Sequence, residues 1–164
     1  MCNIKNHPTL SYRLINNVTG WVAFVVASIT YILTVEPTAS LWDCGEFITT
    51  SVGLQVGHPP GAPLFMMISR FFTMFGGPGQ AAVLVNSMSA LASGATVMFL
   101  FWTITHLAKK VVVKEGEECS MGQLCGIMGA GLVGALTYTF TDTFWFSAVE
   151  GEVYAMSSLI TAVV

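Results

Sequence analysis

The chain is short of charge. Only 9% of its 164 residues are Asp, Glu, Lys or Arg, whereas 54% are hydrophobic, and the mean hydropathy is +0.70. A soluble domain carries about 25% charged residues, because its surface must be wetted. So few charges cannot cover a folded globule in water, which indicates a polytopic membrane protein.

Basic clusters and several reactive motifs are missing as well. The six Lys and Arg residues form no stripe and the net charge is −3, which excludes a polybasic surface for nucleic acid. The four cysteines are scattered without metal-ligand spacing, so they predict no disulfide framework and no metal-binding residues. The sequence has no glycine-rich phosphate loop after a strand and no Gly-x-Ser-x-Gly nucleophile motif.

Apolar runs fill most of the chain. We expect three membrane spans and the start of a fourth, over about residues 18–35, 81–107, 121–141 and from 153 onwards. Glu36-Pro37 ends the first run, because proline cannot continue a helix. An external loop over 37–79 follows, in which Leu64–Phe75 is apolar but too short to span and predicts an interfacial helix.

These runs predict an all-α fold, a polytopic transmembrane helical bundle that forms a single domain over residues 1–164. The last twelve residues would reach only about 18 Å as a helix, short of the roughly 30 Å hydrocarbon core. They indicate either an interfacial tail or the start of a span in a longer polypeptide. We expect the second, with the chain truncated at its C-terminus.

The basic residues predict the orientation. If each expected span crosses once, five of the six share one side: Lys5, Arg13, Lys109, Lys110 and Lys114. Only Arg70 lies opposite, so the N-terminus is expected to be cytoplasmic. Acidic residues hardly affect this rule, yet six of the nine fall outside: Glu36, Asp43, Glu46, Asp142, Glu150 and Glu152. The outer face is therefore expected to be acidic.

The third expected span carries small residues at every fourth position. Gly122, Gly126, Ala130 and Gly134 would form one smooth helical face. Such a face lets another helix approach closely, although membrane helices are generally rich in glycine. We expect this face to be buried against a second helix.

The external loop holds two candidate catalytic carboxylates, Asp43 and Glu46. They are three residues apart, so on a helix they would project from one face. Ionisable groups at a membrane surface are costly unless they pair, bind or react. Asp43 has a second interpretation, because Ser40-Leu41-Trp42-Asp43 resembles a helix-capping box. Glu46 has no capping role.

Four further residues are candidates for substrate binding. His58 starts a segment, His58–Pro63, with three prolines and a glycine in six residues, which predicts a fixed bend. Its imidazole could orient a phosphate or hydroxyl, or only bond a backbone carbonyl. Arg70 could pair with a loop carboxylate or hold a phosphate. Glu150 and Glu152 are two apart, so only one is expected to face a common site.

Several blocks of sequence resemble one known family, the DUF2723 membrane proteins, which include a eukaryotic transmembrane protein O-mannosyltransferase and many bacterial relatives. The resemblance rests on the blocks Glu36–Thr38, Trp42–Phe47, Gly57–Leu64, Asn86–Ala90 and Phe144–Tyr154. It implies a GT-C-type fold, a multi-span helical bundle with an acidic motif in its first external loop. It also implies a lipid-phosphate sugar donor, and this chain would be the amino-terminal part.

The resemblance implies roles for these residues. Asp43 falls on the acidic motif and would be the general base that takes a proton from an acceptor Ser or Thr hydroxyl, with Glu46 behind it. Arg70 and His58 would assist the departing phosphate. The implied reaction moves a sugar, mannose by this resemblance, from a polyprenyl-phosphate donor to protein on the external face. No cofactor is certain and a divalent metal is possible.

Other functions stay open. A transporter or channel segment could use external carboxylates to attract cations, although they cluster in loops rather than along the spans. An accessory subunit is a third possibility. The expected partners are membrane lipid, the polyprenyl-phosphate sugar and an acceptor protein, with no nucleic acid. For the location, an integral protein of a bacterial inner membrane, its site facing the periplasm, is favoured over an endoplasmic reticulum protein whose site faces the lumen.

Overall fold

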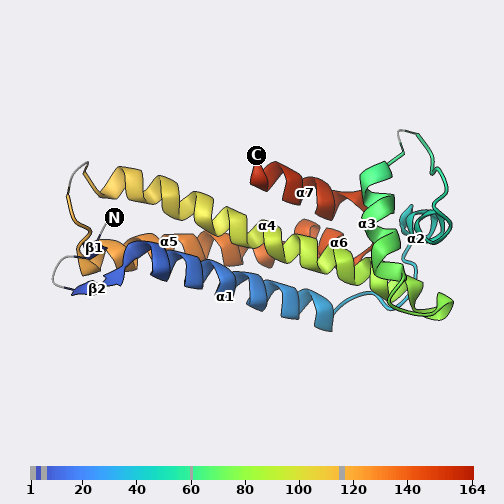
Figure 1. The fold of residues 1–164 in the computed structure, drawn as a ribbon, viewed down its shortest axis with the longest axis horizontal. Helices are drawn as coiled ribbons and strands as arrows, with labels where there is room; N and C mark the ends of the chain where they lie inside the picture. Colours follow the sequence, from blue (N-terminus) through green and yellow to red (C-terminus); the bar gives the residue numbers. More distant parts are fainter. Residues whose placement is uncertain (1–2, 5–6, 60, 115–116) are drawn as a thin grey trace.

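The chain forms a bundle of long helices with short helices at one end (Figure 1). The computed structural model describes residues 3–4, 7–59, 61–114 and 117–164. In chain order its elements are β1 Asn3–Ile4, β2 His7–Ser11, α1 Tyr12–Leu33, α2 Cys44–Gly53, α3 Pro63–Thr73, the 3-10 helix η1 Pro78–Gln80, α4 Ala81–Val112, α5 Met121–Thr139, α6 Asp142–Val149 and α7 Val153–Val163. The predicted all-α membrane bundle is confirmed.

Helix α4 is the centre of the bundle and contacts α1, α3, α5, α6 and α7. Together with α1 and α5 it is long and apolar enough to cross a membrane. In its most apolar stretch 61% of the residues are buried, against 28% in α1 and in α5. The outer helices therefore present apolar faces outward, as expected for contact with lipid. The protein is an integral membrane protein.

The two ends of the bundle differ in charge. Arg13 lies in the first turn of α1, and Lys109 and Lys110 lie in the last turn of α4, at the end of the bundle where β1 and β2 lie (Figure 1). The short helices α2 and α3 gather at the opposite end, where Asp43 and Glu46 lie. The arrangement agrees with the separation of basic and acidic groups expected from the sequence. Which end faces the cytoplasm stays a prediction.

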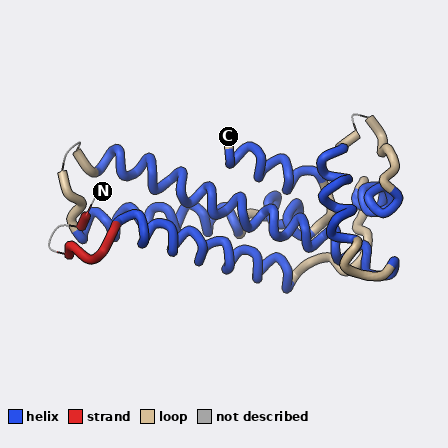
Figure 2. The backbone as a smooth tube through the Cα atoms, viewed as in Figure 1, coloured by secondary structure: helices blue, strands red, loops and turns tan. Residues whose placement is uncertain are grey.

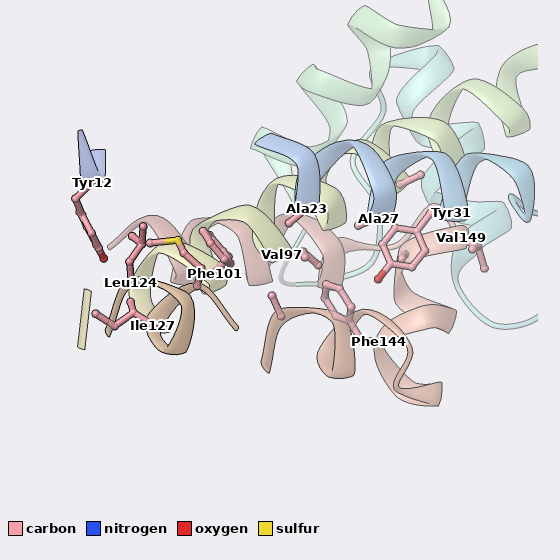
Figure 3. Packing of buried hydrophobic residues seen from close by; sticks show 14 of the residues in the cluster. Tyr12, Ala23, Ala27, Tyr31, Val97, Phe101, Leu124, Ile127, Phe144 and Val149 are labelled. Atoms are coloured by element: carbon pink, nitrogen blue, oxygen red, sulfur yellow. The ribbon is translucent and has the colours of Figure 1, made fainter. Parts of the chain in front are cut away.

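Small and aromatic side chains fix how α1 packs on its neighbours. Ala23 and Ala27 of α1 are buried and lie among the residues of one large core (Figure 3). Near the end of the helix the Tyr31 hydroxyl donates a 2.8 Å hydrogen bond to the Thr139 carbonyl. The Tyr31 ring also packs edge-on against Phe144 and Trp145. This tyrosine therefore joins α1 to the α5–α6 corner beside the acidic end.

The helix bounds differ from the expected spans at several places. Helix α1 begins at Tyr12 rather than near residue 18, and α4 continues to Val112 rather than ending near residue 107. Both extensions are polar or basic turns, which can stay helical outside a hydrocarbon core. The two short strands β1 and β2, red in Figure 2, were not predicted. They are antiparallel and match Asn3 with Ser11 and Ile4 with His7.

The predicted small-residue face of α5 is wrong for most of its length. Gly122, Gly126 and Ala130 are exposed, and no atom of the described residues lies within 4 Å of a Cβ built on either glycine. Only Gly134 meets α4, at the Ile104 side chain. The close approach occurs instead at Gly131, because the larger apolar side chains of α5, Leu124 and Ile127, turn that adjacent face toward α4.

Gly131→Leu should therefore destabilise the bundle, and Gly126→Leu should not. A Cβ at Gly131 would come within 2.6 Å of Thr105 and 2.8 Å of Phe101, and overpacking of this kind typically costs about 1–3 kcal/mol. The measurement is the thermal unfolding midpoint of each variant of this chain in the same detergent. Equal midpoints for the two variants would contradict this packing.

Candidate functional site

The backbone turns sharply just before Asp43 and Glu46 in the loop between α1 and α2. Trp42 has φ of 70°, a left-handed conformation that is rare for a bulky residue, and α2 begins two residues later at Cys44. Asp43 takes the N-cap position, yet its side chain makes no capping hydrogen bond. The capping-box interpretation is thus wrong, and the Asp43 carboxylate, whose side chain is 57% exposed, is available for other contacts.

His58 links the two carboxylates. Its Nδ1 lies 3.0 Å from Glu46 Oε2, and its backbone N–H donates a 2.6 Å hydrogen bond to Glu46 Oε1. The other ring nitrogen, Nε2, lies 3.8 Å from Asp43 Oδ2. That last distance is within ion-pair range but longer than a hydrogen bond. Asp43, Glu46 and His58, called here the acidic trio, therefore converge on one point although twelve residues separate Glu46 from His58.

The close contacts shift two pKa values in opposite directions. The backbone and side-chain hydrogen bonds from His58 lower the pKa of Glu46. The hydrogen bond and negative charge of Glu46, with a smaller effect of Asp43, raise the pKa of His58. Both shifts favour an ionised carboxylate beside a protonated imidazole. His58 is therefore charged over a wider pH range than a free histidine.

The segment that carries His58 is shaped to reach α2. Gly57 leaves room for the Glu46 carboxylate, since a Cβ there would lie 3.0 Å from Glu46 Oε1. The Gly61 N–H donates to the His58 carbonyl at 2.8 Å, which closes a turn, and Gly61 has a φ of 67° that suits glycine. Pro63 then opens α3 in its first turn. Pro60, part of the predicted bend, lies outside the described residues.

A buried asparagine on α4 holds the loop that leads to the acidic trio. Asn86 is fully buried, and its amide nitrogen donates to the carbonyls of Glu36 and Thr38 at 2.7 and 3.1 Å. Its amide oxygen accepts from the Cys44 thiol at 3.8 Å. The side chain thus fixes the start of the loop and the first residue of α2. No role for Asn86 was predicted from the sequence, although a polar amide within an apolar helix was a signal.

Glu150–Glu152, called here the second acidic segment, lies close to the same asparagine. A Cβ at Gly151 would lie 2.8 Å from Asn86 Oδ1, so glycine permits this close approach. The backbone N–H of Glu36 also donates to the Val149 carbonyl at 3.1 Å. Burial raises the pKa of Glu152, and the charges of Glu150 and Asp43 raise it further. The charge of Asp43, a member of the acidic trio, therefore acts on Glu152.

Among the residues that the structure describes, Arg70 forms no ion pair with the acidic trio. It lies in the last turn of α3 and is half-buried. Among the described residues only His58 forms ion pairs with carboxylates. Of the two roles considered for Arg70, the pairing with a loop carboxylate is therefore not seen in this part of the chain.

The trio also offers a donor set for a cation. One ligand atom from each of Asp43, Glu46 and His58 lies within 4.8 Å of the other two. Two carboxylate oxygens with an imidazole nitrogen suit Mn²⁺ or Zn²⁺ better than Mg²⁺, which prefers oxygen alone. The residues fit such an ion if the Glu46–His58 hydrogen bond gives way to it.

Comparisons with known proteins assign the chain to a family. The family described as Protein O-mannosyl-transferase TMEM260 N-terminal domain matches residues 43–164, which include the acidic trio, Asn86 and both carboxylates of the second segment. The chain belongs to the TMEM260 N-terminal domain family. No solved structure matches it.

Two curated relatives extend the comparison. Protein O-mannosyl-transferase tmem260 of Dictyostelium discoideum is 26% identical over 141 residues, which cover 85% of this chain and 15% of that protein. Protein O-mannosyl-transferase TMEM260 of Mus musculus is 27% identical over 137 residues, which cover 82% of this chain and 17% of that protein. The chain thus spans less than a fifth of the length of either relative.

Asn86→Leu should loosen the acidic end, whereas Ser89→Ala should not. Leucine would remove the donor of two part-buried hydrogen bonds to the Glu36 and Thr38 carbonyls, and a polar group left without its partner typically costs about 1–3 kcal/mol when buried. Ser89 is equally buried one turn further along α4, but its hydroxyl has no hydrogen-bond partner among the described residues. The measurement is the maleimide reaction rate of Cys44, followed by mass spectrometry of its peptide, because that thiol is buried beside Asn86.

Cys44 should react faster in Asn86→Leu and at the parent rate in Ser89→Ala. Cys125, which is exposed on α5, gives an internal reference rate in every sample. An unchanged Cys44 rate in Asn86→Leu would contradict the role of the asparagine.

Proposed function

We propose that the chain is the N-terminal part of an integral membrane glycosyltransferase of the GT-C type, as in the DUF2723 proteins. The full-length protein would transfer mannose from a polyprenyl-phosphate donor to Ser or Thr of an acceptor protein on the external face. The names of both relatives support the sugar and the protein acceptor. The observation that carries the proposal is the convergence of Asp43, Glu46 and His58 at one end of the bundle.

Asp43 is the general base in this proposal. Its carboxylate does not cap α2, and unlike that of Glu46 it is not engaged by two close hydrogen bonds from His58. As the acceptor oxygen bonds to the anomeric carbon, its proton passes to Asp43 and the bond from that carbon to the phosphate oxygen breaks. The phosphate leaves with the electron pair. A positioned base of this kind contributes about 10²–10⁴ in rate.

In the proposed reaction Glu46 positions His58, and His58 balances negative charge. Glu46 holds the imidazole through Nδ1 and favours its protonated form by raising its pKa. The cationic ring then lies next to Asp43 and can stabilise the departing phosphate. Arg70 is proposed as a further phosphate contact. Glu152, whose pKa is raised by burial and by nearby carboxylates, is proposed with Glu150 to bind sugar hydroxyls.

The Lys and Arg distribution supports a site on the side of the membrane opposite the cytoplasm. The acidic trio would face the periplasm of a bacterial inner membrane, in preference to the lumen of the endoplasmic reticulum. Both compartments lie on the side opposite the cytoplasm, so the chemistry at the trio is the same in either.

Asp43→Asn in the full-length protein should lower mannosyl transfer by roughly two or more powers of ten, in line with the usual size of general-base effects. Asparagine keeps the shape of the side chain but removes its basic oxygen. Asp142→Asn is the matched control, because Asp142 is an exposed first-turn residue of α6. The assay measures transfer from a polyprenyl-phosphate sugar to acceptor protein in membranes that hold equal amounts of each variant. Near-normal transfer by Asp43→Asn would refute Asp43 as base.

Glu46→Gln should move the alkaline limit of activity to lower pH. If His58 must be protonated, activity falls as pH rises through its pKa, which Glu46 raises above the ordinary value of about 6.5. Removal of the Glu46 charge brings that fall back toward the ordinary value. The measurement is kcat/KM against pH in proteoliposomes, with Glu117→Gln at the opposite end as control. An unchanged alkaline limb in Glu46→Gln would exclude this role of His58.

A divalent-cation site is the second candidate role for the acidic trio, favoured by the convergence of its three ligand atoms within 4.8 Å. An ion there would be held by Asp43, Glu46 and His58 and would supply positive charge for the phosphate. Extensive dialysis against a chelator distinguishes the two roles. Loss of transfer that Mn²⁺ restores would assign a metal site, and unchanged transfer would assign the trio to acid–base chemistry.

A further inference from the structure

A large cavity extends from the basic end of the bundle as far as Tyr138 near the end of α5, and none of the acidic trio lines it. Its volume is about 1160 Å³, and residues from β2, α1, α4, α5 and α7 line it. Three of its lining residues are basic or can become so: Arg13, His106 and Lys109. None of the described residues that line it is acidic. Its charge therefore suits an anion.

The two permanent cations of the cavity are not used by carboxylates. Neither Arg13 nor Lys109 forms an ion pair within the described chain. Lys109 lies over the ring of Tyr12, with Nζ 4.4 Å from the ring centre, a contact that orients the ammonium group without neutralising it. Arg13 is exposed in the first turn of α1. Both charges remain available to a ligand.

Part of the cavity wall is apolar. Phe99, Leu100 and Trp102 contribute to its wall. Two of its hydroxyls already have partners in their own helices, since Thr103 donates to the Phe99 carbonyl at 3.0 Å and Thr161 donates to the Ser157 carbonyl at 2.9 Å. Their polar groups therefore need no hydrogen bond from an occupant. The lining thus combines two permanent cations with an apolar stretch and uncharged polar side chains such as Asn17, Ser157 and Ser158.

We propose that this cavity binds one anionic phospholipid. Its headgroup phosphate contacts Arg13 and Lys109 at the membrane surface, and an acyl chain lies along Phe99, Leu100 and Trp102. Basic pockets between membrane helices bind anionic headgroups in this way, and arginine pairs well with phosphate. The site is separate from the acidic trio and does not depend on the proposed transferase activity.

The test uses the full-length protein in nanodiscs of phosphatidylcholine with a small fraction of phosphatidylglycerol. Native mass spectrometry of the released protein measures how far phosphatidylglycerol is retained over phosphatidylcholine. The parent protein should prefer phosphatidylglycerol, and Arg13→Gln should lower the preference about fivefold, as a cation near a membrane surface contributes. Arg13→Gln with Lys109→Gln should abolish it. Lys109 also contacts Tyr12, so a loss of lipid in the double variant can also come from misfolding. The single Arg13 variant keeps that contact and separates the two effects.

Lys110→Gln with Lys114→Gln is the matched control. It removes two charges at the same end of the bundle that do not line the cavity, so the preference should persist. Inorganic phosphate added at millimolar concentration should not displace the lipid. An equal preference in the parent and Arg13 variants, or an equal loss in the control, would overturn the proposal. Displacement by phosphate would refute a lipid as the occupant, and no preference in the parent would indicate that another helix fills the cavity.

Discussion

The buried amide of Asn86 is the contact on which the acidic end of the bundle depends. It sits on α4, the helix that every other long helix touches, and it binds the carbonyls of Glu36 and Thr38 and the thiol of Cys44. A buried amide is costly unless all its hydrogen-bonding groups find partners. Here they do, and the partners belong to the loop before Asp43. One side chain therefore links the membrane core to the start of α2.

The rest of the site builds on that link. With α2 fixed, Glu46 points to the bend that carries His58, and two hydrogen bonds close the pair. Gly151 packs against the same asparagine, so Asn86 contacts both the second acidic segment and the start of α2. The result is a concentration of negative charge balanced by one imidazole. The hydrogen bonds from His58 lower the pKa of Glu46, whereas burial, with a further contribution from nearby carboxylates, raises that of Glu152.

The sequence predicted the class of fold and the residues of the trio, but not how they meet. Low charge and long apolar runs were enough for a membrane bundle. The partnership of Glu46 with His58 spans the rest of α2 and the loop that follows it, and periodicity carries no information on such contacts. Spacing also suggested that Asp43 caps its helix, because a cap and a free carboxylate have the same sequence pattern.

The prediction of how α5 packs failed for a different reason. Small residues at every fourth position mark a face that can be approached closely, but they do not say which helix approaches it. Leu124 and Ile127 bury more apolar surface than the glycines, and they turn the adjacent face of α5 toward α4. Asn86 was visible as a polar residue in an apolar helix, yet its partners lie 42 to 50 residues away in the chain.

The central claim is that Asp43 and His58 act on the substrate as one unit. A double-mutant cycle on mannosyl transfer by the full-length protein tests it most directly, with Asp43→Asn, His58→Gln and the two combined. For residues that act together, the losses are strongly non-additive. The account predicts that the double variant is about as slow as the slower single variant. Losses that multiply in the double variant would show that the two side chains act independently and would contradict the account.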